Sequence, residues 1–105
     1  MGFFSKLFGS EWKVGELEAA TLVKGGARLL DVRTAAERKS QPLKKSAHIP
    51  VHELSSRSKE LNKKRPIVAV CAHGPRARRA ASVLRKEGFE AYWLAGGVSS
   101  WNATQ

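Results

Sequence analysis

Cysteine is nearly absent from this chain of 105 residues, in which Cys71 is the only one. A single thiol excludes an intramolecular disulfide framework, and it argues against a metal site built from cysteines. The scarcity of cysteine also indicates a reducing compartment, so we expect a cytoplasmic protein. Long apolar runs are absent as well: none approaches the roughly 18 residues that a membrane-spanning helix needs, so the chain is expected to be soluble.

Acidic residues are few, with nine Asp and Glu against 19 Lys and Arg and a formal net charge of +10. Such an excess attracts anions, whether nucleic acid, an acidic membrane surface, an acidic protein or a small anionic substrate. Aromatic side chains are not interleaved with the basic runs as a base-stacking platform requires, which argues against nucleic acid. The acidic residues Glu37, Glu53 and Glu60 show no paired-carboxylate arrangement for acid–base catalysis.

The hydrophobic content of 42% is typical of a globular protein, and the length suits one domain. We expect residues 1–12 to form an apolar and basic extension and residues 13–105 to form the domain. The extension is rich in phenylalanine around Lys6, but it lacks the long apolar region and the cleavage site of a signal peptide. Contact of this extension with a membrane surface is left open beside packing on the domain and disorder.

Helical and strand-like segments alternate along the domain. Short runs rich in branched apolar residues predict strands at residues 27–32, 47–50, 67–70 and 91–94. Hydrophobic spacing predicts helices at residues 14–24, with Val14, Leu17, Thr21 and Leu22 on one face, at residues 52–61, and from residue 75 onward, with Ala77, Ala80, Ala81 and Leu84 on one face.

Two shorter helices complete the pattern. Thr34 is expected to cap a helix in which Glu37 stands at the third position, as in a capping box, and Pro42 limits its length. A terminal helix after residue 97 is expected to dock Trp101 against the core. The alternation predicts an α/β fold, a small open sheet with helices on both faces.

Two polar segments follow predicted strands and so lie where such sheets bind ligands, beyond the carboxyl ends of the strands. Asp31 and Arg33 end one strand, and Cys71 ends the strand at residues 67–70, which is apolar throughout and therefore expected to be central and parallel. A thiol between a strand and a helix start faces free backbone N–H groups and the positive end of a helix dipole, which favours a nucleophilic thiolate. The alternative is that Cys71 is a buried apolar filler.

These segments together resemble the rhodanese family of sulfurtransferases, in particular its small single-domain members. The resemblance rests on Leu-Leu-Asp-Val-Arg at residues 29–33 followed by Glu37, Ile-Pro at 49–50, Cys-Ala-His-Gly-Pro-Arg at 71–76, and Leu-Ala-Gly-Gly at 94–97 with Trp101. It implies one rhodanese-like domain, with a parallel sheet of about five strands between helices. Residues 41–46, Gln-Pro-Leu-Lys-Lys-Ser, depart from the family pattern Gly-His-Ile-Pro-Gly-Ala.

The cysteine loop supplies a rationale for sulfur chemistry. Backbone N–H groups from Ala72 to Arg76, except the one that Pro75 lacks, are expected to surround the Cys71 sulfur as a thiolate or persulfide. Gly74 permits a tight loop and Pro75 stiffens the approach to the helix, while Arg76 is expected to bind an oxyanion through its forked donors.

The implied reaction is sulfur transfer from thiosulfate or a persulfide donor to a thiophilic acceptor, cyanide or a thiol, through a Cys71 persulfide and without metal or cofactor. Cys-x4-Arg is one residue shorter than the Cys-x5-Arg loop of tyrosine phosphatases, and Val70 stands where those enzymes have His, so phosphatase activity is disfavoured. A rhodanese-like binding module or persulfide carrier that docks a partner protein through its basic face is the competing hypothesis.

The sequence defines the roles of the remaining polar residues near the loop less closely. His73 is interpreted as a proton donor or cationic wall, or else as an exposed loop side chain. The resemblance implies that Asp31 and Arg33 form a mainly structural ion pair. The expected partners are a small anionic sulfur donor, a thiol acceptor and an acceptor protein, and the oligomeric state is left open.

Overall fold

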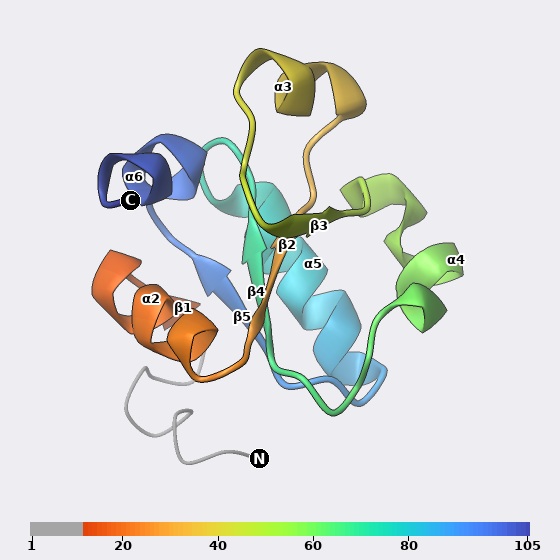
Figure 1. The fold of residues 1–105 in the computed structure, drawn as a ribbon. Helices are drawn as coiled ribbons and strands as arrows, with labels where there is room; N and C mark the ends of the chain where they lie inside the picture. Colours follow the sequence, from red (N-terminus) through yellow and green to blue (C-terminus); the bar gives the residue numbers. More distant parts are fainter. Residues whose placement is uncertain (1–11) are drawn as a thin grey trace.

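The computed structural model describes residues 12–105 and contains a five-stranded sheet in the order β1-β5-β4-β2-β3, in which every neighbouring pair is parallel (Figure 1). The strands are β1 (Lys13–Val14), β2 (Arg28–Asp31), β3 (Ser46–His48), β4 (Ile67–Val70) and β5 (Ala91–Leu94). β4 lies at the centre and all four of its residues are buried, as its apolar sequence predicts. The predicted α/β class and the parallel sheet of five strands are confirmed.

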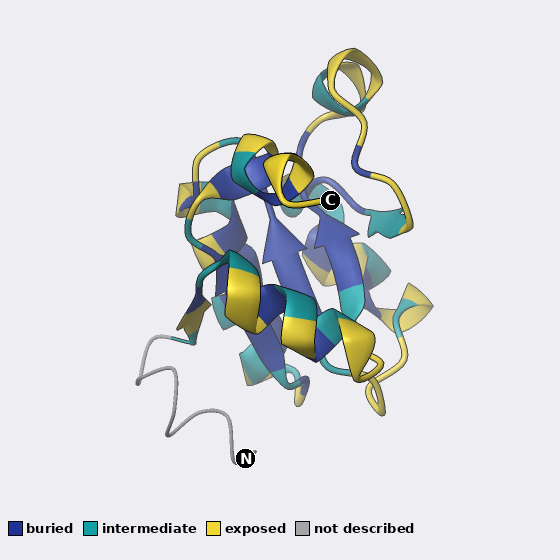
Figure 2. Ribbon diagram, turned by 60° about the vertical axis from the view of Figure 1, so that its left-hand side comes forward, coloured by how far each residue is buried: buried dark blue, intermediate teal, exposed yellow. Residues whose placement is uncertain are grey.

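Helical segments cover both faces of this sheet. They are α2 (Glu16–Lys24), η1 (Val51–Glu53), α4 (Leu54–Arg57), η2 (Ser58–Glu60), α5 (Pro75–Lys86) and α6 (Gly97–Ala103). A further helix, α3 (Ala35–Ser40), lies beyond the carboxyl ends of the strands and buries none of its side chains (Figure 1). One buried cluster joins the sheet to α4 and α5, and a second joins it to α2 and α6 (Figures 1 and 2). The burial of apolar surface on both sides therefore fixes the sheet between two helical layers.

Helix α5 confirms the predicted pattern residue by residue. Its buried side chains are those of Ala77, Ala80, Ala81 and Leu84. Three of these are alanines, so the helix axis approaches the sheet closely, and α5 makes extensive contacts with β4 and β5. The helix that begins immediately after the cysteine loop thus packs closely against the central strand.

Three sequence predictions need correction. Val14 belongs to the edge strand β1 rather than to a helix, because it pairs with Leu94 of β5. Helix α2 buries Ala19 and Leu22, whereas Leu17 is 82% exposed and Thr21 is exposed. Residues 51–60 form a short α-helix between two 3-10 turns instead of one continuous helix.

The shorter elements otherwise follow the prediction. Thr34 caps α3 in a capping box with Glu37, and the helix ends before Pro42. Trp101 in α6 is buried in the core. The predicted extension of residues 1–12, with its membrane alternative, lies outside the described residues except for Trp12, whose carbonyl accepts a hydrogen bond from the Trp93 N–H.

Candidate active site

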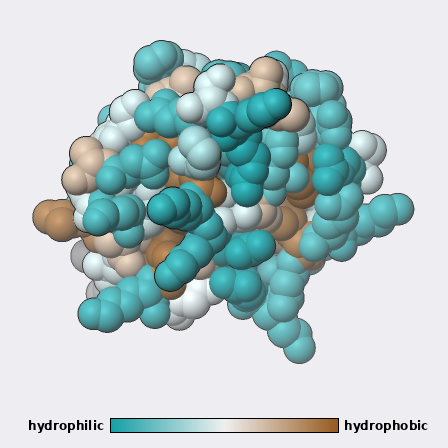
Figure 3. All heavy atoms as spheres, turned by 45° about the horizontal axis from the view of Figure 1, so that its top comes forward, coloured by the Kyte–Doolittle hydropathy of each residue, from teal (hydrophilic) through white to brown (hydrophobic). Residues whose placement is uncertain are grey.

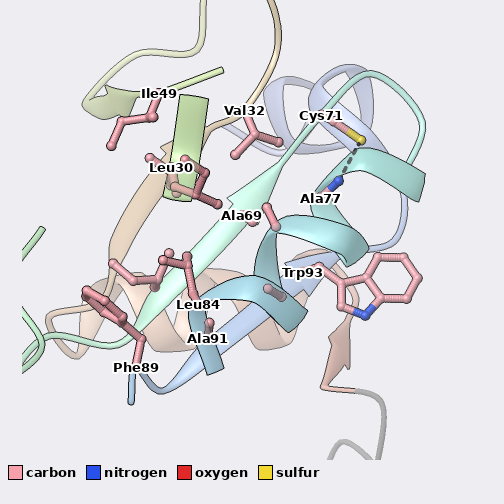
Figure 4. Close-up of a cluster of buried hydrophobic side chains, with 14 residues drawn as sticks. Leu30, Val32, Ile49, Ala69, Cys71, Ala77, Leu84, Phe89, Ala91 and Trp93 are labelled. Carbon is pink, nitrogen blue, oxygen red and sulfur yellow. Dashed lines mark hydrogen bonds between the residues drawn. The ribbon is translucent and has the colours of Figure 1, made fainter. Parts of the chain in front are cut away.

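Cys71 lies directly after β4 and is fully buried. Its Sγ accepts hydrogen bonds from the backbone N–H groups of Gly74 at 3.0 Å and Ala77 at 3.3 Å. Figure 4 shows the sulfur pointing toward the Ala77 nitrogen at the start of α5. Gly74 lies within the loop predicted to surround the sulfur, whereas Ala77 lies beyond it. The N–H of Ala77 is available because the first turn of a helix leaves its amide donors without helical partners.

The loop between Cys71 and α5 is shaped by Gly74 and Pro75. Gly74 has φ +116°, a conformation that side chains rarely adopt, and a Cβ on it would lie 3.1 Å from the Ala95 carbonyl oxygen. Pro75 occupies the first position of α5, where its missing N–H costs no hydrogen bond. These two residues turn the chain so that the next free amide groups face the sulfur.

Helix α6 supports the same loop from the other side. The Val98 N–H donates to the Cys71 carbonyl at 2.9 Å. Gly97 has φ +79°, and a Cβ there would lie 2.0 Å from the Ala72 carbonyl oxygen. Only glycine therefore lets α6 come this close to the cysteine loop, a function of Gly97 that the sequence analysis did not identify.

Asp31 and Arg33 form a buried ion pair at the neighbouring strand end. Arg33 Nε and Nη2 each lie 2.8 Å from a carboxylate oxygen of Asp31, and Arg33 also donates to the carbonyls of Glu37 and Gln41. Burial favours a neutral Asp31, but the hydrogen bonds from Arg33 and Arg38 hold the pKa of this carboxyl below its usual range. Through its contacts with the Glu37 and Gln41 carbonyls, Arg33 of this pair anchors α3 and the segment after it.

Arg76 is engaged in a contact that sequence reasoning missed. Its Nη1 lies 2.6 Å and its Nη2 2.9 Å from the two carboxylate oxygens of Glu37 in α3. The forked donors expected to bind an oxyanion are thus occupied by a side chain 39 residues away in the sequence. Thr34 and Glu37 signal a capping box, but no local pattern indicates that the same carboxylate reaches Arg76.

A recess of about 310 Å³ opens beside the cysteine loop. Its lining consists of Arg33, Ala36, Glu37, Ser40, Gln41 and Ala72. His73 is exposed on the loop. Figure 3 shows that hydrophilic side chains gather over this end of the molecule, with apolar atoms between them. The recess lies where Ala72 of the cysteine loop meets α3.

The divergent residues 41–46 fold against α6. Gln41 Nε2 donates to Ser99 Oγ at 3.0 Å, and Asn102 Nδ2 donates to the Pro42 carbonyl at 3.1 Å. Leu43 is buried, and Lys45 has φ +58°. Lys45 stands where the family pattern has its second glycine, so the backbone keeps a glycine-like conformation although the glycine is gone.

The sequence and the fold of this chain resemble those of known proteins. Residues 15–104 match the family model described as the rhodanese-like domain. The chain belongs to the rhodanese-like family. The structure resembles that of a rhodanese-related protein from Thermoplasma volcanium, with a TM-score of 0.79 and 27% identity over 88% of this chain and 91% of the other. It also resembles the human single-domain sulfurtransferase TSTD1, with a TM-score of 0.77 and 25% identity over 90% and 97% of the two chains.

Curated relatives of this rhodanese-like domain include the thiosulfate sulfurtransferase GlpE of Pseudomonas savastanoi, which is 34% identical over 88 residues covering 83% of both chains. GlpE of Coxiella burnetii is 30% identical over 93 residues covering 87% of both chains. These relatives support a sulfurtransferase activity in general. Among residues 12–105, no helix is long and apolar enough to cross a membrane, and no group of three His, Cys, Asp or Glu side chains is placed to hold a metal ion.

Proposed function

We propose that this rhodanese-like domain moves sulfane sulfur from thiosulfate or a persulfide donor to a thiophilic acceptor through a persulfide on Cys71. The observation that carries the proposal is the position of the Cys71 sulfur, which accepts two backbone N–H bonds at the start of α5. Amide donors and the helix dipole favour a negatively charged sulfur over a neutral thiol. The same donors suit the outer sulfur of a persulfide after transfer.

The first step loads the enzyme. The Cys71 thiolate attacks the outer sulfur of thiosulfate, a new S–S bond forms, and the bond between the two donor sulfurs breaks, so that sulfite leaves with the electron pair. With an alkyl persulfide as donor, the leaving group is the alkyl thiolate. Neither reaction needs a metal or an organic cofactor, because the sulfane sulfur is itself the electrophile.

The second step unloads it. A thiolate or cyanide attacks the outer sulfur of the Cys71 persulfide, takes that sulfur as a new persulfide or as thiocyanate, and returns the thiolate to Cys71. A reducing compartment such as the cytoplasm keeps Cys71 reduced and supplies thiol acceptors. The acceptor in the cell is a low-molecular-weight thiol or an acceptor protein drawn to the basic surface.

Intact-mass measurement tests the proposal. Incubation with thiosulfate or an alkyl persulfide is expected to add one sulfur atom to the protein, and cyanide or a thiol is expected to remove it. Cys71→Ser is expected to fold with nearly unchanged stability, since serine also accepts the two N–H bonds, and to gain no sulfur.

Absence of an adduct with every donor would instead favour the binding-module hypothesis. A large loss of stability in Cys71→Ser, measured by urea denaturation, would indicate that Cys71 serves mainly as a buried filler.

A further inference from the structure

The contact between Glu37 and Arg76 joins α3 to the first turn of α5, directly after the cysteine loop. Both terminal nitrogens of Arg76 donate to the two oxygens of Glu37, in the bidentate geometry that makes arginine–carboxylate pairs strong. A sulfur donor with oxyanion groups would bind the same two nitrogens of Arg76, which are already bound to the Glu37 carboxylate. The pair therefore places a protein anion where a substrate anion was expected.

Glu37 stays charged under all ordinary conditions. The hydrogen bonds from Arg76, followed by that from the Thr34 N–H, lower the pKa of the Glu37 carboxyl to about 2. Both side chains are about one-third exposed, so the pair lies at the surface rather than in the core. Because the pair is partly exposed, solvent reduces its strength, and an anion that makes the same forked contact competes with Glu37 for Arg76.

Glu37 also belongs to the wall of the recess beside the loop, together with Arg33 and Ala72. Among the described residues of that wall, Arg33 is the only cation, and its guanidinium group is already bound to Asp31 and to two carbonyl groups. Helix α3 buries none of its side chains and is held by such polar contacts. A donor that binds Arg76 must therefore displace the Glu37 carboxylate from it.

We propose that Glu37 determines donor specificity by competing with anionic donors for Arg76. This inference rests on the proposed sulfurtransferase function. Thiosulfate carries two negative charges and sulfonate oxygens that match a guanidinium group, so its binding requires release of Glu37. An alkyl persulfide carries at most one charge and no oxyanion, so it loads Cys71 without Arg76. Glu37 therefore weakens thiosulfate binding relative to alkyl persulfide binding.

Glu37→Gln is the decisive variant, because glutamine keeps an oxygen that accepts the Thr34 N–H bond and preserves the cap of α3. The KM for thiosulfate is expected to fall about fivefold to tenfold, because a neutral glutamine competes less well than a carboxylate for Arg76. The kcat is expected to change less than twofold, because the competition affects binding of the donor and not the transfer step. The KM for an alkyl persulfide whose alkyl chain carries no charge is expected to change less than twofold.

Glu60→Gln is the matched control. It removes the same charge from an exposed ion pair with Arg57. The adjacent Ser58 hydroxyl donates to Glu87, just after α5 ends, so this segment lies at the opposite end of α5 from Arg76. Glu60→Gln is expected to leave the thiosulfate KM unchanged within twofold, which separates competition for Arg76 from the effect of net charge.

The double variant Glu37→Gln with Arg76→Ala tests the route of the effect. If Glu37 acts through Arg76, the gain in thiosulfate affinity disappears when Arg76 is absent. Persistence of that gain, or an unchanged or higher thiosulfate KM in Glu37→Gln alone, would overturn the inference.

Calorimetric binding of thiosulfate to Cys71→Ser, with and without Glu37→Gln, provides a readout that needs no turnover. Tighter binding in the Glu37→Gln background supports the competition even if no Cys71 persulfide ever forms, whereas equal binding contradicts it. Failure of sulfur loading with every donor would instead count against the proposed function alone.

Discussion

At three residues of the site, Cys71, Arg76 and Gly97, the geometry is set by contacts of only one or two atoms. The Cys71 sulfur is held by the Gly74 and Ala77 amides, Arg76 is held by Glu37, and Gly97 makes room for the Ala72 carbonyl. Gly97 is the least conspicuous of these residues in the sequence, since a glycine at the start of a helix is usually interpreted as part of a turn. In the structure it is the residue that allows α6 to hold the cysteine loop.

Gly97→Ala is therefore expected to be strongly destabilising. The added Cβ would lie 2.0 Å from the Ala72 carbonyl oxygen at a φ of +79°. Displacement of backbone atoms together with left-handed strain costs about 2–4 kcal/mol in the free energy of unfolding. Gly26→Ala is the control, because Gly26 also has a positive φ, +114°, but no atom within 4 Å of an added Cβ. Urea denaturation measures both losses, and equal values would contradict the steric role of Gly97.

At the scale of elements, α3 and residues 41–46 form the most unusual part of the site. The family glycines and histidine are missing, yet the segment keeps its path through polar contacts: Arg33 donates to the Glu37 and Gln41 carbonyls, and Arg38 donates to Asp31 and Ser46. The side chains of Arg33 and Arg38 thus hold this segment in place. Lys45, at the place of the second family glycine, has a positive φ.

Lys45→Gly is expected to stabilise the protein. Lys45 has φ +58°, so glycine relieves left-handed strain, and the net gain is about 0.5–1 kcal/mol after the added flexibility of the unfolded chain is counted. Lys44→Gly removes the same charge from the neighbouring position, which has no positive φ, and is expected to lose about 0.5–1 kcal/mol. The midpoints of urea denaturation distinguish the two variants; a loss in both would show that residue 45 carries no strain.

At the scale of the whole molecule, the formal charge of +10 surrounds a site whose nearest cations are already paired. Arg33 binds Asp31, and Arg76 binds Glu37. The attraction of an anionic donor to the site therefore depends on the electric field of all the surface charges together. It does not depend on a single unpaired cation among the described residues that line the recess. Such a field is screened by salt, whereas a short buried contact is screened much less.

The KM for thiosulfate is accordingly expected to rise about threefold between about 20 mM and about 300 mM salt, over which the screening length falls from roughly 20 Å to about 6 Å. The value of kcat is expected to change less, because the attacking sulfur is buried. An alkyl persulfide donor, with its smaller charge, provides the control in the same salt series. A thiosulfate KM independent of salt would show that the overall charge does not guide the donor.

Much of the fold could be predicted because its signals are local. The apolar run of β4, the alanine face of α5 and the capping box at Thr34 each depend on residues a few positions apart. Predictions failed where a distant element decided the outcome. Helical periodicity predicts that Leu17 is buried, but α2 buries Ala19 and Leu22 instead. Val14 belongs to a strand because it pairs with β5 at the edge of the sheet.

The sequence by itself determined the order of the elements and the place of Cys71 between a buried strand and a helix, because hydrophobic periodicity and turn residues act over short distances. Only the tertiary structure decided which groups meet that cysteine. The approach of Gly97 to Ala72 and the pairing of Glu37 with Arg76 join residues far apart in the chain, and no local pattern records them. They arise because packing of α5 and α6 on the sheet, and anchoring of α3 by buried Arg33, bring these segments to one edge.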